Sequence, residues 1–143
     1  MTGQPDPVQS QQRARRRWAL LFLVFSAFVL RVAGLGAREF WFDEVLSANV
    51  SALGWGGILT HQRTQPFEHP PLYFLLLFPW QQLAGRTEYA LRFFSVLWGV
   101  LLLPLLYWFL GRLAGERLGL LAALLATLSP FLVAYSQEAR MYA

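Results

Sequence analysis

The sequence contains no cysteine among its 143 residues. A disulfide framework, a thiolate metal site and a cysteine nucleophile are therefore excluded. Lysine is also absent, so all twelve basic residues are arginine. Charged residues make up only 14% of the chain, whereas 56% of it is hydrophobic. A soluble domain of this length cannot bury so much apolar surface, so we expect lipid to cover part of it.

Four arginines immediately precede the first long apolar run, and they set the expected orientation of the chain. They are Arg13, Arg15, Arg16 and Arg17, and the run covers residues 18–36. A net charge of +4 is compatible with nucleic-acid binding, but arginines beside an apolar run are typical of the cytoplasmic end of a membrane span. We therefore expect no nucleic-acid partner, and a disordered cytoplasmic tail over residues 1–17.

The apolar run at 18–36 is long enough to cross a bilayer, since it would extend about 28 Å as a helix. A cleaved signal peptide is the alternative, because small residues follow the run at Gly34, Gly36 and Ala37. The run is long for such a segment, however, and Arg31 interrupts its end. We expect the Arg31 side chain to extend to the outer surface of the membrane.

Two further apolar runs complete an expected all-α integral membrane fold with three transmembrane helices. These spans are predicted at residues 88–110 and 118–135, with a kink at Pro104 and an interruption at Ser129-Pro130. Residues 37–87 are too polar, and too broken by glycine and proline, to be one span. They are expected to form an outer loop.

The outer loop has two segments with the pattern of juxtamembrane, or interfacial, helices. The first has apolar residues at near-helical spacing and three glycines that should fray its end: Val45, Leu46, Val50, Leu53 and Ile58, then Gly54, Gly56 and Gly57. A linker is expected at 61–68. Pro70-Pro71 can open a second helix, whose apolar part, residues 72–80, covers about half of a bilayer. Neither helix is expected to cross the membrane.

The side on which the last residues emerge follows from this arrangement. If the second interfacial helix does not cross, they lie on the same outer side as Asp43. The opposite topology would turn Arg112 and Arg117 outward, against the positive-inside tendency. We therefore expect three polar clusters to meet at the outer surface, at residues 43–44, 68–72 and 137–142.

Each cluster also has an explanation that involves no chemistry. Asp43 is a candidate N-cap, with Glu44 as a first-turn acid of the same helix. Glu88 and Arg92 have the i,i+4 spacing of a helical ion pair. His69 precedes proline and can cap the next helix. An arginine such as the one at position 140 can simply extend to the interface.

Four short motifs, taken in order, resemble a known family. They are Trp41-Phe42-Asp43-Glu44, His69-Pro70-Pro71-Leu72, Ala90-Leu91-Arg92 with Ser95, and Ser129-Pro130 followed by residues 135–142. Together they resemble the polytopic glycosyltransferases of the GT-C superfamily, near the protein O-mannosyltransferase and aminoarabinose-transferase branches. The resemblance covers about residues 13–143, so residues 18–143 would be the amino-terminal part of such a transferase domain.

The resemblance implies a polyprenyl-phosphate sugar as the donor, with its head group at the outer leaflet. Asp43 would be the base that takes the proton of the acceptor hydroxyl, and Glu44 would orient it or contact the acceptor. The arginines Arg92 and Arg140 would hold the phosphate. The substrate-binding set would be completed by Glu138, Tyr142 and His69. One base and one face of attack imply inversion at the anomeric carbon.

A divalent metal ion is a possible cofactor in this interpretation. In the aminoarabinose-transferase branch, an acidic residue and a lysine precede the Pro-Pro pair, and the acid can help to hold a metal. The corresponding residues here are Glu68 and His69. Two or three oxygen and nitrogen ligands far apart in sequence do not define a site, so metal dependence stays open.

Other classes of function remain open at this stage. A transporter or flippase would use the same charges to line a path, although such proteins usually place charges near the bilayer midplane. A non-catalytic membrane fragment is the second alternative. Three spans enclose little space, so we expect the chain to be part of a longer protein and to be inactive alone. The expected location is a bacterial inner membrane, and the acceptor (protein, lipid or glycan) is not identified.

Overall fold

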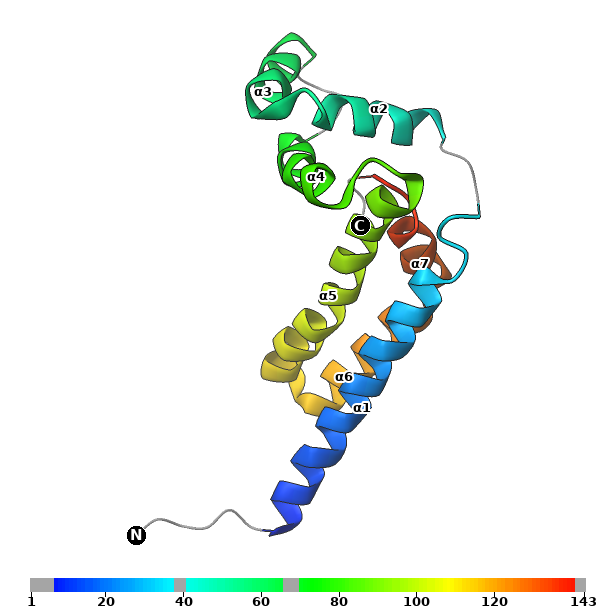
Figure 1. Cartoon of the computed structure of the whole chain (residues 1–143). Helices are drawn as coiled ribbons and strands as arrows, with labels where there is room; N and C mark the ends of the chain where they lie inside the picture. Colours follow the sequence, from blue (N-terminus) through cyan, green and yellow to red (C-terminus); the bar gives the residue numbers. More distant parts are fainter. Residues whose placement is uncertain (1–6, 38–40, 66–69, 141–143) are drawn as a thin grey trace.

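The computed structural model describes residues 7–37, 41–65 and 70–140, and each regular element in these ranges is a helix (Figure 1). Three helices contact one another as a bundle: α1 (Pro7–Val32), α5 (Glu88–Ala114) and α6 (Glu116–Leu128). Three more lie at the upper end of this bundle in Figure 1: α2 (Phe42–Ser51), α3 (Gly54–Thr64) and α4 (Pro71–Ala84). The short α7 (Pro130–Ser136) packs against α1 and α5. The expected all-α fold is confirmed.

α1 begins earlier than the sequence suggested. Pro7 is its first residue, a position at which proline is well tolerated because the amide hydrogen has no helical partner there. The helix therefore includes residues 7–17 of the tail that was expected to be disordered, while residues 1–6 lie outside the described part. At the other end it stops at Val32 and the chain turns over residues 33–36.

A tight hairpin joins α5 to α6 at the lower end of the bundle. Gly115 makes the reversal with a φ of +93°, a conformation that glycine adopts readily. Gly119 allows the two helices to approach closely, since a Cβ there would lie 2.5 Å from the Tyr107 carbonyl oxygen. Arg16 of α1 forms an ion pair with Glu116 at the same end. The arginine-rich start of α1 therefore lies beside this hairpin.

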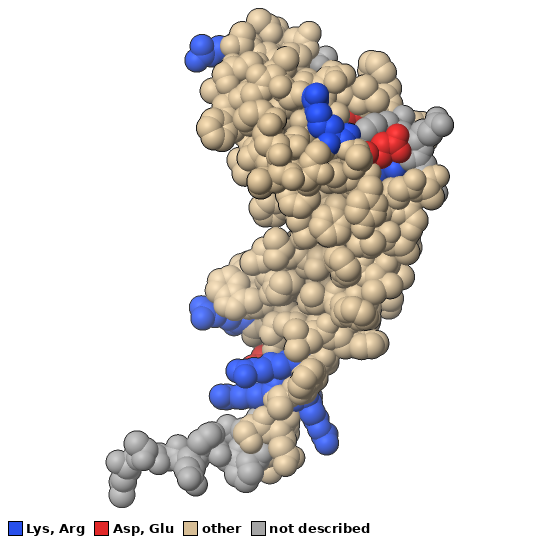
Figure 2. Space-filling view, in the orientation of Figure 1, with Lys and Arg blue, Asp and Glu red and all other residues tan. Residues whose placement is uncertain are grey.

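Among the described helices, α5 alone is long and apolar enough to cross a membrane. α6 and α7 also qualify if they form one span, with a bend of 62° at the Ser129-Pro130 break. α1 does not qualify, because its arginine cluster lies inside the helix and its apolar part ends at Val32. The expected three spans are therefore shown only in part. Figure 2 shows charged side chains at the two ends of the visible face and a broad uncharged zone between them.

The outer loop contains more helix than expected. The prediction that three glycines would fray the end of a single helix is wrong, because Gly54 starts α3 and the helix continues through Gly56 and Gly57 to Thr64. Packing stabilises this additional helix, since Ile58 of α3 is buried with Val50 of α2 and Phe74 of α4 in one apolar cluster.

α4 follows the expected pattern at its start. Pro71 is its first residue, and the helix has 14 residues, which is short of the roughly 20 residues that a span needs. Its Leu77 is buried with Leu91 and Phe94 of α5 and with Ala139, which follows α7. This cluster fixes the start of α5 and the segment after α7 against the helices of the outer loop.

Candidate functional site

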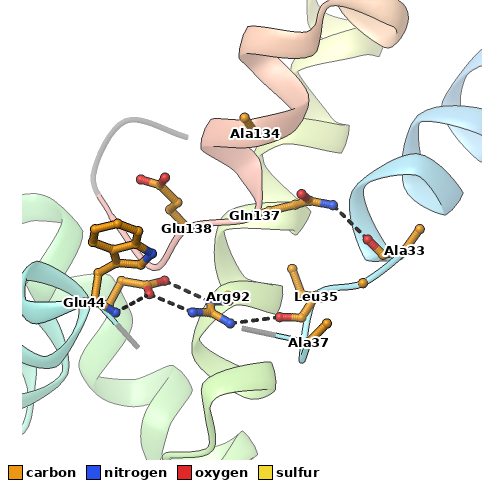
Figure 3. Close-up of a pocket in the computed structure, with 10 residues that line it drawn as sticks. Ala33, Leu35, Ala37, Glu44, Arg92, Ala134, Gln137 and Glu138 are labelled. Carbon is orange, nitrogen blue, oxygen red and sulfur yellow. Dashed lines mark hydrogen bonds and ion pairs between the residues drawn. The ribbon is translucent and has the colours of Figure 1, made fainter. Parts of the chain in front are cut away.

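A pocket of about 320 Å³ lies where α1 ends, beside the starts of α2 and α5 and the end of α7 (Figure 3). Its polar lining comes from Glu44, Arg92, Gln137 and Glu138. Trp41, Ala134 of α7 and four residues that follow α1 (Ala33, Gly34, Leu35 and Ala37) complete the wall. Four segments that are distant in the sequence therefore meet at one end of the bundle.

Local sequence places Glu44 in the first turn of α2 and Arg92 at the start of the second turn of α5. In α2, Glu44 accepts a hydrogen bond from the backbone N–H of Trp41 at 3.1 Å, which satisfies a donor at the helix start. In α5, the Thr87 hydroxyl oxygen accepts from the N–H of Ala90 at 3.2 Å. This cap sets the start of α5 and places Arg92 one turn inside it.

Glu44 and Arg92 form a buried ion pair. Arg92 Nε donates to Glu44 Oε1 at 2.9 Å, and Nη2 donates to Oε2 at 2.8 Å. The two side chains are only 1% and 4% exposed. Arg92 Nη1 also donates to the Leu35 carbonyl at 3.1 Å. The buried partner of Arg92 is thus a distant carboxylate from another helix, and the pair ties α2, α5 and the chain after α1 together.

The carboxylate of Glu44 is fully occupied by donors. Besides the two bonds from Arg92 and the bond from Trp41, its Oε1 accepts from the backbone N–H of Ala139 at 2.8 Å. Four donors match the acceptor capacity of a carboxylate. Burial raises the pKa of Glu44, but the bonds from Arg92, Ala139 and Trp41 lower it by more, so its pKa is below the usual value. Glu44 is therefore an ionised anchor.

Asp43 has a different environment from its neighbour. Its carboxylate forms an ion pair with Arg140, and the side chain is 48% exposed. The Arg140 Nε lies 3.7 Å from Glu138 Oε2. The idea that Asp43 caps α2 is wrong, because Trp41 is the N-cap residue and Glu44 makes the bond to its N–H. Asp43, Glu138 and Arg140 are therefore a partly exposed charged group.

Several expected site residues lie outside the described part of the chain. These are Glu68, His69 and Tyr142. Within residues 7–37, 41–65 and 70–140, no three histidine, aspartate or glutamate side chains gather as a metal site. The metal interpretation of Glu68 and His69 is thus left as an expectation.

Sequence reasoning gave no role to Ala139 and Gln137, which help to build the site, and it misplaced Arg31 of α1. Ala139 contributes a backbone N–H, which no side-chain pattern can reveal. Gln137 was part of a motif, and its amide donates to carbonyls at the end of α1, for instance Ala33 at 3.0 Å. Arg31 was expected to extend to the surface, which is wrong, because it is fully buried. The break of the apolar run at Arg31 was the available signal.

Comparison with known proteins identifies the family. The family model described as dolichyl-phosphate-mannose-protein mannosyltransferase matches residues 68–141, just over half of the 143 residues. Arg92 and Arg140 lie in the matched region, and Asp43 and Glu44, which precede it, contact it through these arginines. No curated protein and no solved structure matches the chain. The chain therefore belongs to the dolichyl-phosphate-mannose-protein mannosyltransferase family, whose members are membrane glycosyltransferases of the GT-C type.

Proposed function

We propose that this chain forms the donor-side catalytic end of a glycosyltransferase that moves a sugar from a polyprenyl-phosphate donor to an acceptor hydroxyl. The observation that carries the proposal is the contact between Asp43 and Arg140. Their neighbours Glu44 and Glu138 line the polar pocket at this end of the bundle. Family membership supports the reaction class. The acceptor is a hydroxyl whose carrier, whether protein, lipid or glycan, is for experiment to identify.

Arg140 is the residue that we propose holds the donor phosphate. A phosphate leaving group needs no general acid, but its negative charge must be held as the bond to the sugar breaks. The planar guanidinium of arginine binds two phosphate oxygens at once. Arg140 is partly exposed, with 25% of its side chain accessible, so a donor can reach it. Loss of one such charge-stabilising group typically costs about 10²- to 10³-fold in rate.

Asp43 is the proposed base. Its carboxylate is half-exposed and has Arg140 as its ionic partner, so it is accessible to an acceptor hydroxyl. When the donor phosphate binds Arg140, it competes with Asp43 for the same guanidinium. Asp43 is then available to accept the hydroxyl proton as the oxygen attacks the anomeric carbon. Attack opposite the leaving phosphate inverts that carbon.

Glu44 and Arg92 have a positioning role in this proposal rather than a role in bond making. Glu44 accepts two hydrogen bonds from Arg92 and two from the backbone N–H groups of Trp41 and Ala139. Arg92 donates to Glu44 and to the carbonyl of Leu35. The sequence analysis assigned both Arg92 and Arg140 to the phosphate, and we now propose that Arg140 alone binds it. The pair holds α2 and the segment with Ala139 together, and that contact places Asp43 next to Arg140.

The proposed sidedness follows the distribution of charge. The arginine cluster and the Arg16–Glu116 pair lie at one end of the bundle, and Asp43 and Arg140 lie at the other. With the arginine-rich end in the cytoplasm, the reaction takes place at the outer face. A bacterial inner membrane is the proposed location.

The test is sugar transfer from a radiolabelled polyprenyl-phosphate donor in membranes that contain the protein expressed from its complete gene. Asp43→Asn keeps the size of the side chain but cannot take the proton, so transfer should fall at least 100-fold. Glu116→Gln is the matched control, because it also removes a carboxylate from an exposed ion pair with arginine. Equal transfer by the parent and Asp43→Asn, at equal expression, would exclude Asp43 as the base.

A further inference from the structure

Arg31 is a buried arginine in α1 that the proposed reaction does not use. Its side chain has no exposed surface. Nη2 donates to the carbonyl of Ala126 at 3.0 Å, Nε to the Ser136 hydroxyl at 3.2 Å, and Nη1 to the carbonyl of Ala27 at 3.3 Å. Among the described residues, no carboxylate forms an ion pair with it. A charge buried in this way is costly and calls for a specific reason.

The reason lies in the break between α6 and α7. In an uninterrupted helix, the carbonyl of Ala126 would accept from the N–H of the residue at position 130. That residue is Pro130, which has no N–H. Apolar surroundings offer no water to replace the lost bond, so the carbonyl needs another donor. Arg31 supplies it from a different helix.

A second set of bonds runs in the opposite direction. Gln137, directly after α7, donates from its amide Nε2 to the carbonyl of Ala33, just after α1, at 3.0 Å. The same nitrogen lies at 3.2 Å from the carbonyl of Arg31 and at 3.3 Å from that of Leu30, so its two hydrogens are shared among these carbonyls. A helix end leaves such carbonyls without partners. A side chain of α1 thus donates to a free carbonyl at the break before α7, and the residue after α7 donates to free carbonyls at the end of α1.

The neighbouring helix leaves room for this junction. A Cβ at Gly99 of α5 would lie 2.3 Å from the Ser136 hydroxyl oxygen and 3.2 Å from Arg31 Nε. Glycine at this position therefore lets the serine and the guanidinium sit against the α5 backbone. Three helices contribute to the junction, which we define as Arg31, Gly99, Pro130, Ser136 and Gln137.

We propose that Arg31 is a positioning residue for the donor site, because it replaces the amide lost at Pro130 and so holds the bend between α6 and α7. The direction of α7 determines where the next residues lie. Among them, Ala139 donates to Glu44, and Arg140 meets Asp43. The role in transfer rests on the proposed function, whereas the role in the bend does not.

The experiment compares Arg31→Met with the parent in lipid nanodiscs. The chain has no native cysteine, so spin labels can be attached at Thr60→Cys in α3 and Phe131→Cys in α7, which are both exposed. The distance distribution between the labels reports the direction of α7. Methionine has a similar length but no donor, so the distribution should broaden and transfer should fall about 10- to 100-fold, mainly in kcat. Arg63→Met, an exposed arginine of α3, is the matched control and should change neither.

A second change separates positioning from stability. Adding Pro130→Ala to Arg31→Met returns an amide to the carbonyl of Ala126, so thermal stability should recover while the bend straightens. Transfer should then stay low, and the labels should report a new distance. If transfer recovers together with stability, or if folded Arg31→Met keeps the parental distance, the proposal is overturned.

Two further outcomes are a variant that does not fold and a parent protein that transfers no sugar. If Arg31→Met does not fold, Arg31→Lys retains the charge and one donor group, and it should show an intermediate broadening; a parental distance would refute the role. If the distances respond as expected but the parent transfers no sugar, the glycosyltransferase proposal fails and the role of Arg31 in the bend stands.

Discussion

Replacing Glu44 by glutamine should strongly destabilise the fold, although it changes only one charge. Glu44 is 1% exposed and Arg92 is 4% exposed at the side chain. Glutamine can still accept through its one carbonyl oxygen, but its NH₂ group would face donors of Arg92 or Trp41. The guanidinium of Arg92 would then be buried without a counter-charge. Removing one partner of a buried pair costs about 3–5 kcal/mol, and we expect Glu44→Gln to lower the free energy of unfolding by this amount.

Asp43→Asn provides the contrast for this experiment. This substitution also removes an ion pair with an arginine, but the Asp43 side chain is 48% exposed. An exposed pair contributes only about 0–1 kcal/mol to the free energy of unfolding. Denaturant titration in mixed micelles, followed by the fluorescence of the six tryptophans, measures both. The double variant Glu44→Gln with Arg92→Gln removes both charges and should be less destabilised than Glu44→Gln alone. A loss below about 1 kcal/mol in Glu44→Gln would refute the anchoring role.

The pH dependence of stability tests the same carboxylate without changing the arginine. The folded-state pKa of Glu44 lies below its unfolded value, because the bonds from Arg92 and two backbone amides outweigh the effect of burial. The ionised form therefore stabilises the fold above an unfolded pKa of about 4.3, and the stabilisation is lost as the pH falls through the folded pKa. The parent should lose stability on acidification below about pH 4, and Glu44→Gln should show a flatter profile. Parallel profiles would contradict the assignment.

Two further predictions concern the donor and the junction. Arg140→Lys replaces a planar fork by a point charge, so the KM for the polyprenyl-phosphate donor should rise about tenfold or more with the fold intact; an unchanged KM would remove Arg140 from the phosphate site. Gly99→Ala should destabilise the protein by about 1–3 kcal/mol because the methyl group would overlap the Ser136 hydroxyl. Gly56→Ala, which meets no atom within 4 Å, is the control in the same denaturant titration.

Local signals in the sequence predicted the elements whose stability is itself local. Pro71 marked the first residue of α4, and the apolar run after Glu88 marked α5. α3 was missed because its three glycines weaken the intrinsic helix preference, while Ile58 gains its burial from residues of α2 and α4. Tertiary packing of this kind is not visible in a window of neighbouring residues.

The contacts of the site were less predictable, for the same physical reason. Arg92 pairs with Glu44 across 48 positions, and Ala139 bonds the same carboxylate across 95 positions. From the sequence, these segments could be expected to lie close together only because of the predicted topology and the resemblance of their motifs to a known family. Which donor meets which acceptor depends on helix direction, and that direction depends in part on the bend at Pro130.

The adjacent carboxylates of α2 illustrate how such contacts divide roles between neighbours. Successive residues of a helix point about 100° apart, so Asp43 and Glu44 cannot both face the bundle. Glu44 faces inward, where four donors hold it ionised, and Asp43 faces the partly exposed Arg140. A base must exchange a proton with substrate, which a carboxylate saturated by buried donors cannot do. The exposed member of the pair is therefore the one suited to chemistry, and the buried member is the one suited to hold it in place.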